Sequence, residues 1–142
     1  MSKVKPAPLS PETVIGGYRV VRKVAAGGFC WGGSQSFQFA TNSKEIKAAF
    51  VFYGTGPMKM EDLSRINCPV YGFYGGNDAR VTSTVEKSSD LMKEANKKFE
   101  PVTYDGAGHG FMRAGEAPDA TPVNKAAREQ AWERWKQILG KL

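Results

Sequence analysis

Short apolar runs alternate along the chain with segments in which apolar residues recur every three or four positions. The apolar runs lie beside glycine-rich stretches, as buried strands do, and they span residues 23–29, 46–53, 69–74 and 99–104. The periodic segments predict helices over residues 31–41 and 82–97, and a last helix that begins at Thr121-Pro122. Strands that alternate with helices predict an α/β fold, with a mainly parallel sheet of about four to five strands flanked by helices.

The same periodicity predicts which helix faces pack on the sheet. In the helix over residues 82–97, the inner positions are expected to be Val85, Ser89, Met92 and Ala95 or Asn96. In the last helix they are expected to be Ala127 or Arg128, Ala131, Trp135, Ile138 or Leu139, and Leu142.

Residues 1–22 do not share this pattern. Their Lys- and Pro-rich start predicts a loose N-terminal arm. Residues 11–22 are open to two interpretations, because Ser10-Pro11 favours a helix start whereas Gly16-Gly17 and the β-branched residues favour a strand. Residues 23–142 are expected to form one domain without internal repeats.

Composition narrows the class of protein. The chain has 142 residues, of which 41% are hydrophobic, and this suits one globular domain. The formal net charge is +6, but basic and acidic residues are interleaved, so we expect a solvated surface and no nucleic-acid partner. No apolar stretch approaches the ~18–20 residues of a membrane span. Because no apolar run follows the basic start as in an intact signal peptide, a cytoplasmic protein is expected; the alternative is a mature exported form from which the signal peptide has been removed.

Three reactive residues follow three of the predicted strands. Cys30 comes after the first strand, Asp78 after the third and His109 after the fourth. The carboxyl ends of parallel strands meet at one edge of a sheet, where ligands bind. We therefore expect the three side chains to converge, although they are far apart in the sequence.

Cys30 lies in Gly-Phe-Cys-Trp-Gly-Gly (28–33), which has the form of a nucleophile elbow with a thiol. We expect a Cβ at Gly28 or Gly32 to clash in this turn, and Cys30 to have a strained backbone. The helix that begins at Trp31 is expected to lower the thiol pKa, and the Trp31 N–H to donate to an oxyanion. The alternative is an inert, buried cysteine, which is the role expected of Cys68.

His109 is the only histidine, and it lies in the glycine-rich segment Gly-Ala-Gly-His-Gly-Phe (106–111). An imidazole has the near-neutral pKa that a base for a thiol needs, and a carboxylate at Asp78 would orient it. The order nucleophile, acid, histidine is the chain order of α/β-hydrolases. One histidine and two separated cysteines form no zinc pattern, so we expect no metal and no organic cofactor.

These motifs resemble those of the dienelactone hydrolases (carboxymethylenebutenolidases). The resemblance covers residues 23–142 and includes Tyr53-Gly54 and the segment from Cys68-Pro69 to Gly-Gly-Asn-Asp (75–78). It implies hydrolysis of a small carboxylic ester or lactone by a Cys-His-Asp triad, through an acyl-enzyme. The triad falls on the three residues named above.

The resemblance also assigns two residues to substrate binding. It implies that Arg113 binds a substrate carboxylate and that Tyr53 lines the site, so the substrate is expected to include anionic esters or lactones. Read from the sequence alone, Arg113 is equally well a solvated loop charge.

The resemblance covers only the C-terminal half of the family's domain, so residues 23–142 are expected to form a truncated α/β-hydrolase domain. The family's second oxyanion donor, its thiol-binding glutamate and a second carboxylate-binding arginine have no counterpart in this sequence. We therefore expect weak activity, and a homodimer or domain-swapped assembly that covers the exposed sheet edge. The alternative is a non-catalytic domain that binds ligands in the same cleft.

Overall fold

The computed structural model describes residues 14–15, 18–19 and 24–142. In the N-terminal part, β1 (Val14–Ile15) pairs with β2 (Tyr18–Arg19) in antiparallel orientation. The strand interpretation of residues 11–22 is therefore correct where these residues are described. The rest of the predicted arm over residues 1–22 lies outside the described residues.

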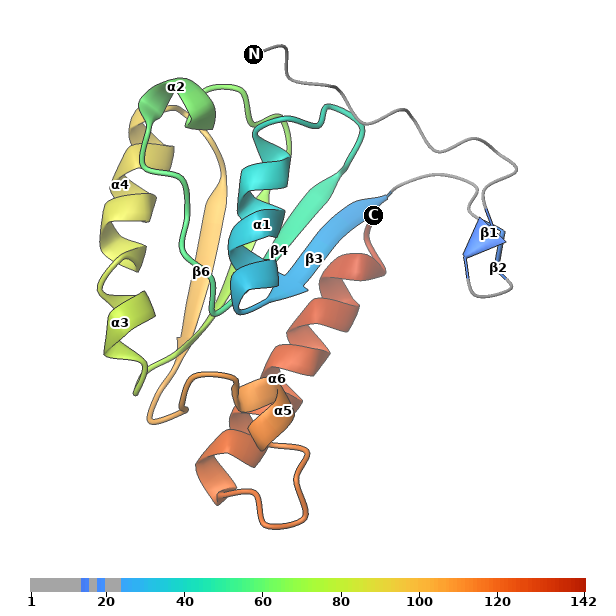
Figure 1. Ribbon diagram of the computed structural model, residues 1–142, viewed down its shortest axis with the longest axis vertical. Helices are drawn as coiled ribbons and strands as arrows, with labels where there is room; N and C mark the ends of the chain where they lie inside the picture. Colours follow the sequence, from blue (N-terminus) through green and yellow to red (C-terminus); the bar gives the residue numbers. More distant parts are fainter. Residues whose placement is uncertain (1–13, 16–17, 20–23) are drawn as a thin grey trace.

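Four parallel strands form the main sheet, in the spatial order β3-β4-β5-β6 (Figure 1). They are β3 (Ala25–Phe29), β4 (Ala48–Phe52), β5 (Val70–Gly75) and β6 (Phe99–Tyr104). The two central strands, β4 and β5, are buried along their whole length, because helices cover both faces of the sheet. The predicted parallel sheet of about four to five strands is confirmed, and it has four strands in the described part of the chain.

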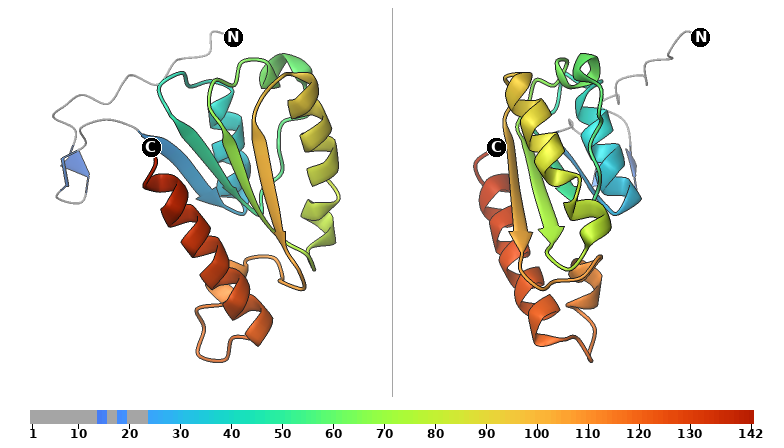
Figure 2. Two further views of the ribbon diagram at one scale, coloured as in Figure 1. Left: turned by 180° about the vertical axis from the view of Figure 1, so that it is seen from behind. Right: turned by 90° about the vertical axis from the view of Figure 1, so that its left-hand side faces the viewer.

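Helices cover the two faces of this sheet as separate layers. They are α1 (Trp31–Ala40), α2 (Met60–Leu63), α3 (Ala79–Thr82), α4 (Val85–Glu94), α5 (Phe111–Ala114) and α6 (Pro122–Leu139). The edge-on view in Figure 2 shows α1 and α4 on one face and α6 on the other. None of the helices in the described part of the chain is both long and apolar enough to cross a bilayer.

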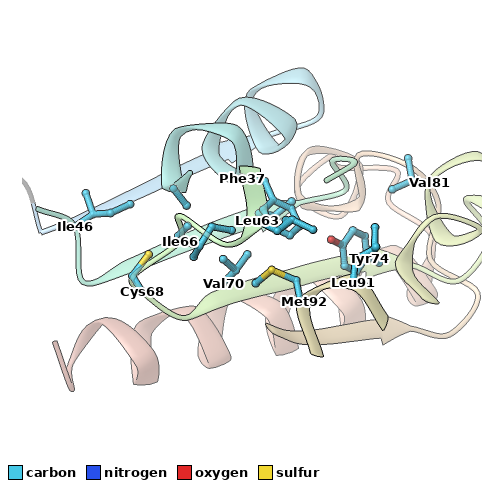
Figure 3. Packing of buried hydrophobic residues seen from close by; sticks show 13 residues of the cluster. Phe37, Ile46, Leu63, Ile66, Cys68, Val70, Tyr74, Val81, Leu91 and Met92 are labelled. Carbon is cyan, nitrogen blue, oxygen red and sulfur yellow. The ribbon is translucent and has the colours of Figure 1, made fainter. Parts of the chain in front are cut away.

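The hydrophobic core consists of one cluster on each face. Figure 3 shows the cluster beneath α1, α2 and α4, in which Phe37, Leu63 and Met92 are completely buried. Cys68 is 7% exposed and belongs to this cluster, so the packing role predicted for it is confirmed. The second cluster joins the opposite sheet face to α5 and α6 through buried aromatic and alanine side chains.

The bounds of the helix predicted over residues 82–97 are wrong, because the structure has two pieces here: α3 ends at Thr82, and α4 covers only Val85–Glu94. The hydroxyl of Thr84 donates to the Val81 carbonyl at 2.7 Å and closes the first piece. Of the predicted inner positions, Met92 is buried and Val85 and Ala95 pack against the same cluster, so these three are confirmed. Ser89 is only half-buried, and Ser88 and Leu91 are buried in its place.

The inner face predicted for the last helix is confirmed. Ala127 and Ala131 are buried, and Trp135, Ile138 and Leu142 pack against the same cluster. Leu139, the alternative to Ile138, is exposed. The alanines allow α6 to lie close to the aromatic side chains of the sheet.

Candidate active site

Cys30, Asp78 and His109 come together at the carboxyl edge of the sheet. The Sγ atom of Cys30 lies 3.2 Å from Nε2 of His109, and Nδ1 of His109 lies 2.5 Å from Oδ2 of Asp78. The three side chains therefore form a hydrogen-bonded chain, as the strand topology predicted. Within the described residues, no three His, Cys, Asp or Glu side chains are grouped so that they could hold a metal ion.

The turn between β3 and α1 has the strained form expected of a nucleophile elbow. Cys30 has φ 58°, and its N–H donates to the Phe52 carbonyl at 3.0 Å. A Cβ at Gly28 would lie 2.1 Å from the Gly32 carbonyl oxygen, so the clash predicted there is confirmed. The clash predicted at Gly32 is wrong, because nothing lies within 4 Å of a Cβ at that position.

The second tight position of the elbow is Gly33, where a Cβ would lie 2.5 Å from the Phe52 carbonyl oxygen. Gly54, after β4, is close to the same turn, and a Cβ there would lie 2.3 Å from the Ser34 nitrogen. The glycine requirement thus arises where α1 crosses the end of β4. This contact joins segments that are distant in the sequence, so the local motif does not reveal it.

The site lowers the pKa of its thiol and raises the pKa of its imidazole. The hydrogen bond from His109 lowers the pKa of the exposed Cys30, and the Trp31 backbone N–H lowers it further. The hydrogen bond to Asp78 raises the pKa of His109, and the bond to Cys30 adds to this effect. Both shifts favour a thiolate-imidazolium pair. Cys30 is exposed, so the part of the alternative that placed it among buried cysteines is wrong.

A cavity of about 820 Å³ opens beside the thiol. Its apolar lining residues include Phe29, Met112 and Trp132, of which Trp132 is 43% exposed. Arg113 and Arg128 also line the cavity. The lining of the cavity thus combines apolar side chains with two guanidinium groups and the carboxylate of Glu116.

The two arginines differ in how firmly they are held. Arg128 donates from Nε to the Met112 carbonyl at 3.0 Å, and its Nη2 lies 3.3 Å from Glu116. Arg113 is exposed and has no ion pair within the described part of the chain. The sequence prediction placed Arg113 at the site but missed Arg128 and Trp132, since it treated both only as parts of the last helix. The only sequence signal for either residue was the helical periodicity, which offered Arg128 as an alternative to Ala127 on the inner face of the last helix.

Tyr53, the other predicted binding residue, also lines the cavity. It follows β4 with φ 40°, and its ring meets the His109 ring edge-on at 5.2 Å between centroids. Burial, with a smaller effect of the Cys30 charge, raises the pKa of Tyr53 to about 12.

A parallel sheet with a nucleophile elbow, and with an acid and a histidine on later strand ends, defines an α/β-hydrolase domain. The family model for the dienelactone hydrolase family matches residues 16–142. The chain belongs to this family, and the predicted resemblance is confirmed.

Known relatives share sequence and fold with this chain. A protein of Saccharolobus solfataricus named "Putative carboxymethylenebutenolidase" is 33% identical over 122 residues, which are 86% of this chain and 46% of that protein. An Escherichia coli K12 protein of the same name is 33% identical over 135 residues, with 85% of this chain and 48% of that protein covered. The chain thus spans about half the length of these relatives.

Solved structures agree with this assignment. A Klebsiella pneumoniae protein described as "Putative Dienelactone Hydrolase" has a TM-score of 0.65 and 29% identity, over 77% of this chain and 48% of that one. The metagenomic "Dienelactone Hydrolase-like Promiscuous Phospotriesterase P91" has a TM-score of 0.73 at 23% identity, over 87% and 54% of the two chains. The second likeness supports the fold alone.

Proposed function

We propose that this chain hydrolyses small carboxylic esters or lactones with Cys30 as the nucleophile. One observation carries the proposal: an exposed thiol lies 3.2 Å from an imidazole whose other nitrogen lies 2.5 Å from a buried carboxylate. A nucleophile, its base and the group that orients the base are all within hydrogen-bond distance. Membership of the dienelactone hydrolase family supports the same reaction class.

In the first half-reaction, the Cys30 thiolate attacks the carbonyl carbon of the ester. His109 has already taken the thiol proton, and Asp78 stabilises the resulting imidazolium. The Trp31 N–H, which lies against the sulfur in this structure, donates to the oxyanion. The imidazolium then gives its proton to the leaving alkoxide, and an acyl-enzyme remains on the sulfur.

In the second half-reaction, water replaces the leaving group. Neutral His109 accepts a proton from the water as it attacks the acyl-enzyme, and the Cys30 thiolate leaves. A lactone differs only in that its leaving alkoxide stays attached to the acyl group.

The cavity lining supports a small substrate with an anionic group. Arg113 is exposed and lines the same cavity as Cys30, and a guanidinium binds a carboxylate through two parallel N–H donors. The apolar lining residues Phe29 and Trp132 suit the hydrocarbon part of such a substrate. Several relatives carry the name putative carboxymethylenebutenolidase, which denotes an enzyme that acts on a lactone of this kind.

Hydrolysis of p-nitrophenyl acetate tests the proposal. The wild-type protein and Cys68→Ser are expected to release nitrophenol at equal rates, whereas Cys30→Ala and His109→Ala fall to the buffer rate. Mass spectrometry after rapid acid quenching is expected to locate an acetyl group on Cys30. Equal rates in all four proteins would contradict the proposal and favour the non-catalytic, ligand-binding alternative.

A further inference from the structure

Two non-glycine residues of the cavity have a positive φ: Cys30 at 58° and Tyr53 at 40°. Among the described residues only Asn96 shares this property. Strained backbone persists where the surrounding structure enforces it, and it is concentrated at functional sites. The elbow accounts for Cys30, whereas lining a cavity does not require a strained backbone at Tyr53.

The ring of Tyr53 is held from several sides. Its centroid lies 5.2 Å from that of His109, 5.5 Å from that of Phe111 and 6.1 Å from that of Phe29. The Tyr53 N–H donates to the Phe73 carbonyl at 2.8 Å, and the residue is only 4% exposed. The strain and the packing together fix the phenol against the His109 ring, in the lining of the cavity that Cys30 also lines.

The hydroxyl of Tyr53 is free to act on a ligand. It has no hydrogen-bond partner among the residues that the structure describes. The polar side-chain atoms that are both fully buried and unpartnered do not include the Tyr53 hydroxyl. This hydroxyl is therefore accessible, and Tyr53 lines the cavity. With a pKa of about 12, the phenol keeps its proton and remains a donor at any ordinary pH.

We propose that the Tyr53 hydroxyl is a second oxyanion donor, which acts with the Trp31 N–H on the same oxygen. This inference rests on the proposed function. When Sγ of Cys30 attacks, the C–S bond forms and the π electron pair of the carbonyl moves to oxygen. Tyr53 donates a hydrogen bond to that oxygen and keeps its own proton. When the π bond forms again, the bond to the leaving group breaks, and His109 protonates the leaving group.

The binding of trifluoroacetone, followed by fluorine NMR, tests the donor without turnover. The thiolate adds to this ketone and produces a tetrahedral adduct with an oxyanion but without a leaving group. Tyr53→Phe is expected to weaken the adduct on the order of 10²-fold, as the loss of one oxyanion donor does. Tyr104→Phe is the matched control, since Tyr104 also packs on Phe111 but lies outside the cavity lining.

A second measurement separates the donor from the thiol. Alkylation of Cys30 by iodoacetamide is a displacement at saturated carbon that forms no oxyanion, so Tyr53→Phe is expected to leave its rate unchanged. Equal adduct affinities for wild type and Tyr53→Phe would overturn the inference. So would an alkylation rate that falls in Tyr53→Phe together with the adduct affinity. A wild-type protein that forms no adduct would overturn it as well. An adduct that needs Tyr53, together with ester hydrolysis that does not need Cys30, would overturn only the proposed function.

Discussion

Nδ1 of His109 lies 2.5 Å from Oδ2 of Asp78, and the two side chains differ in exposure, at 34% and 6% respectively. The buried carboxylate faces the imidazole while the opposite ring nitrogen faces Cys30. Asp78 therefore determines which nitrogen of His109 carries the proton and which one is left for the thiol.

Replacing Asp78 by Asn removes this control. An amide at that position has nearly the same shape, but its NH₂ group stabilises the wrong tautomer of His109, so we expect kcat to fall by about 10³–10⁴-fold. Since the bond to Asp78 is the main cause of the raised His109 pKa, the pKa is expected to fall as well. Proton NMR of the single imidazole measures this pKa directly. An unchanged titration in Asp78→Asn would show that the carboxylate does not act on His109.

The reactivity of Cys30 is expected to extend to unusually low pH. The Cys30 pKa is lowered, so the thiolate persists as pH falls below the range of an ordinary thiol and is lost only at the lowered pKa. The raised His109 pKa keeps the imidazolium charged as pH rises through the ordinary histidine range. Iodoacetamide alkylation rates measured against pH in Cys68→Ser report on Cys30 alone. In His109→Ala the midpoint should move upward, and coincident profiles would contradict the pairing.

Gly28 and Gly32 should respond in opposite ways to alanine. A Cβ at Gly28 meets backbone at 2.1 Å, so Gly28→Ala is expected to lower the free energy of unfolding by about 1–3 kcal/mol or more. Gly32 has open space around its Cβ position and lies within α1, so Gly32→Ala is expected to leave stability unchanged or raise it by up to ~1 kcal/mol. Urea unfolding compares the two, and equal losses would show that the elbow is packed differently.

Replacing Arg113 by Ala should raise KM for anionic substrates and leave KM for neutral substrates unchanged. The loss of its guanidinium in Arg113→Ala is expected to raise KM for p-nitrophenyl hemisuccinate on the order of tenfold or more. The same variant should hydrolyse the neutral acetate ester with the wild-type KM, which provides an internal control. A similar rise for both esters would indicate that the substitution disturbs the cavity rather than removing a carboxylate contact.

A second copy of the chain is expected to cover the outer edge of β3. Within the described residues β3 pairs only with β4, so its other side presents backbone donors and acceptors to a further strand. We propose a homodimer or domain-swapped assembly, and light scattering at micromolar concentration should give twice the mass of the chain. A mass of one chain across that range would contradict it.

The sheet was predictable because β3, β4 and β5 are short runs of apolar residues and glycine, and because a further β-rich segment follows the helix after β5. Strand β6 begins at Phe99 and ends at Tyr104, as the pattern predicts, and the other strands differ by at most two residues at either end. The break between α3 and α4 was not predictable from periodicity, since Ser83 and Thr84 are compatible with a helix. It depends on a side-chain hydrogen bond that competes with the helical backbone.

The convergence of Cys30, Asp78 and His109 was predictable from topology, since parallel strands bring their carboxyl ends to one edge. The residues that line the cavity were not predictable in the same way. Arg128 and Trp132 reach the site because of the direction in which α6 crosses the sheet, and this depends on packing rather than on the local sequence. The error at Gly32 has a similar origin, because the close contact at the elbow is made by Gly33 against β4.

The hydrogen bond between Cys30 and His109 joins residues that are 79 positions apart. Every main strand from β3 to β6 lies between or beside these two residues, so the bond forms only after the whole sheet has assembled. Loop closure over such a distance makes folding slow compared with that of proteins built from local contacts. The reactivity of the Cys30 thiolate at low pH therefore reports complete folding. During refolding, this reactivity should be regained only after the helices and the early strand pairs have formed.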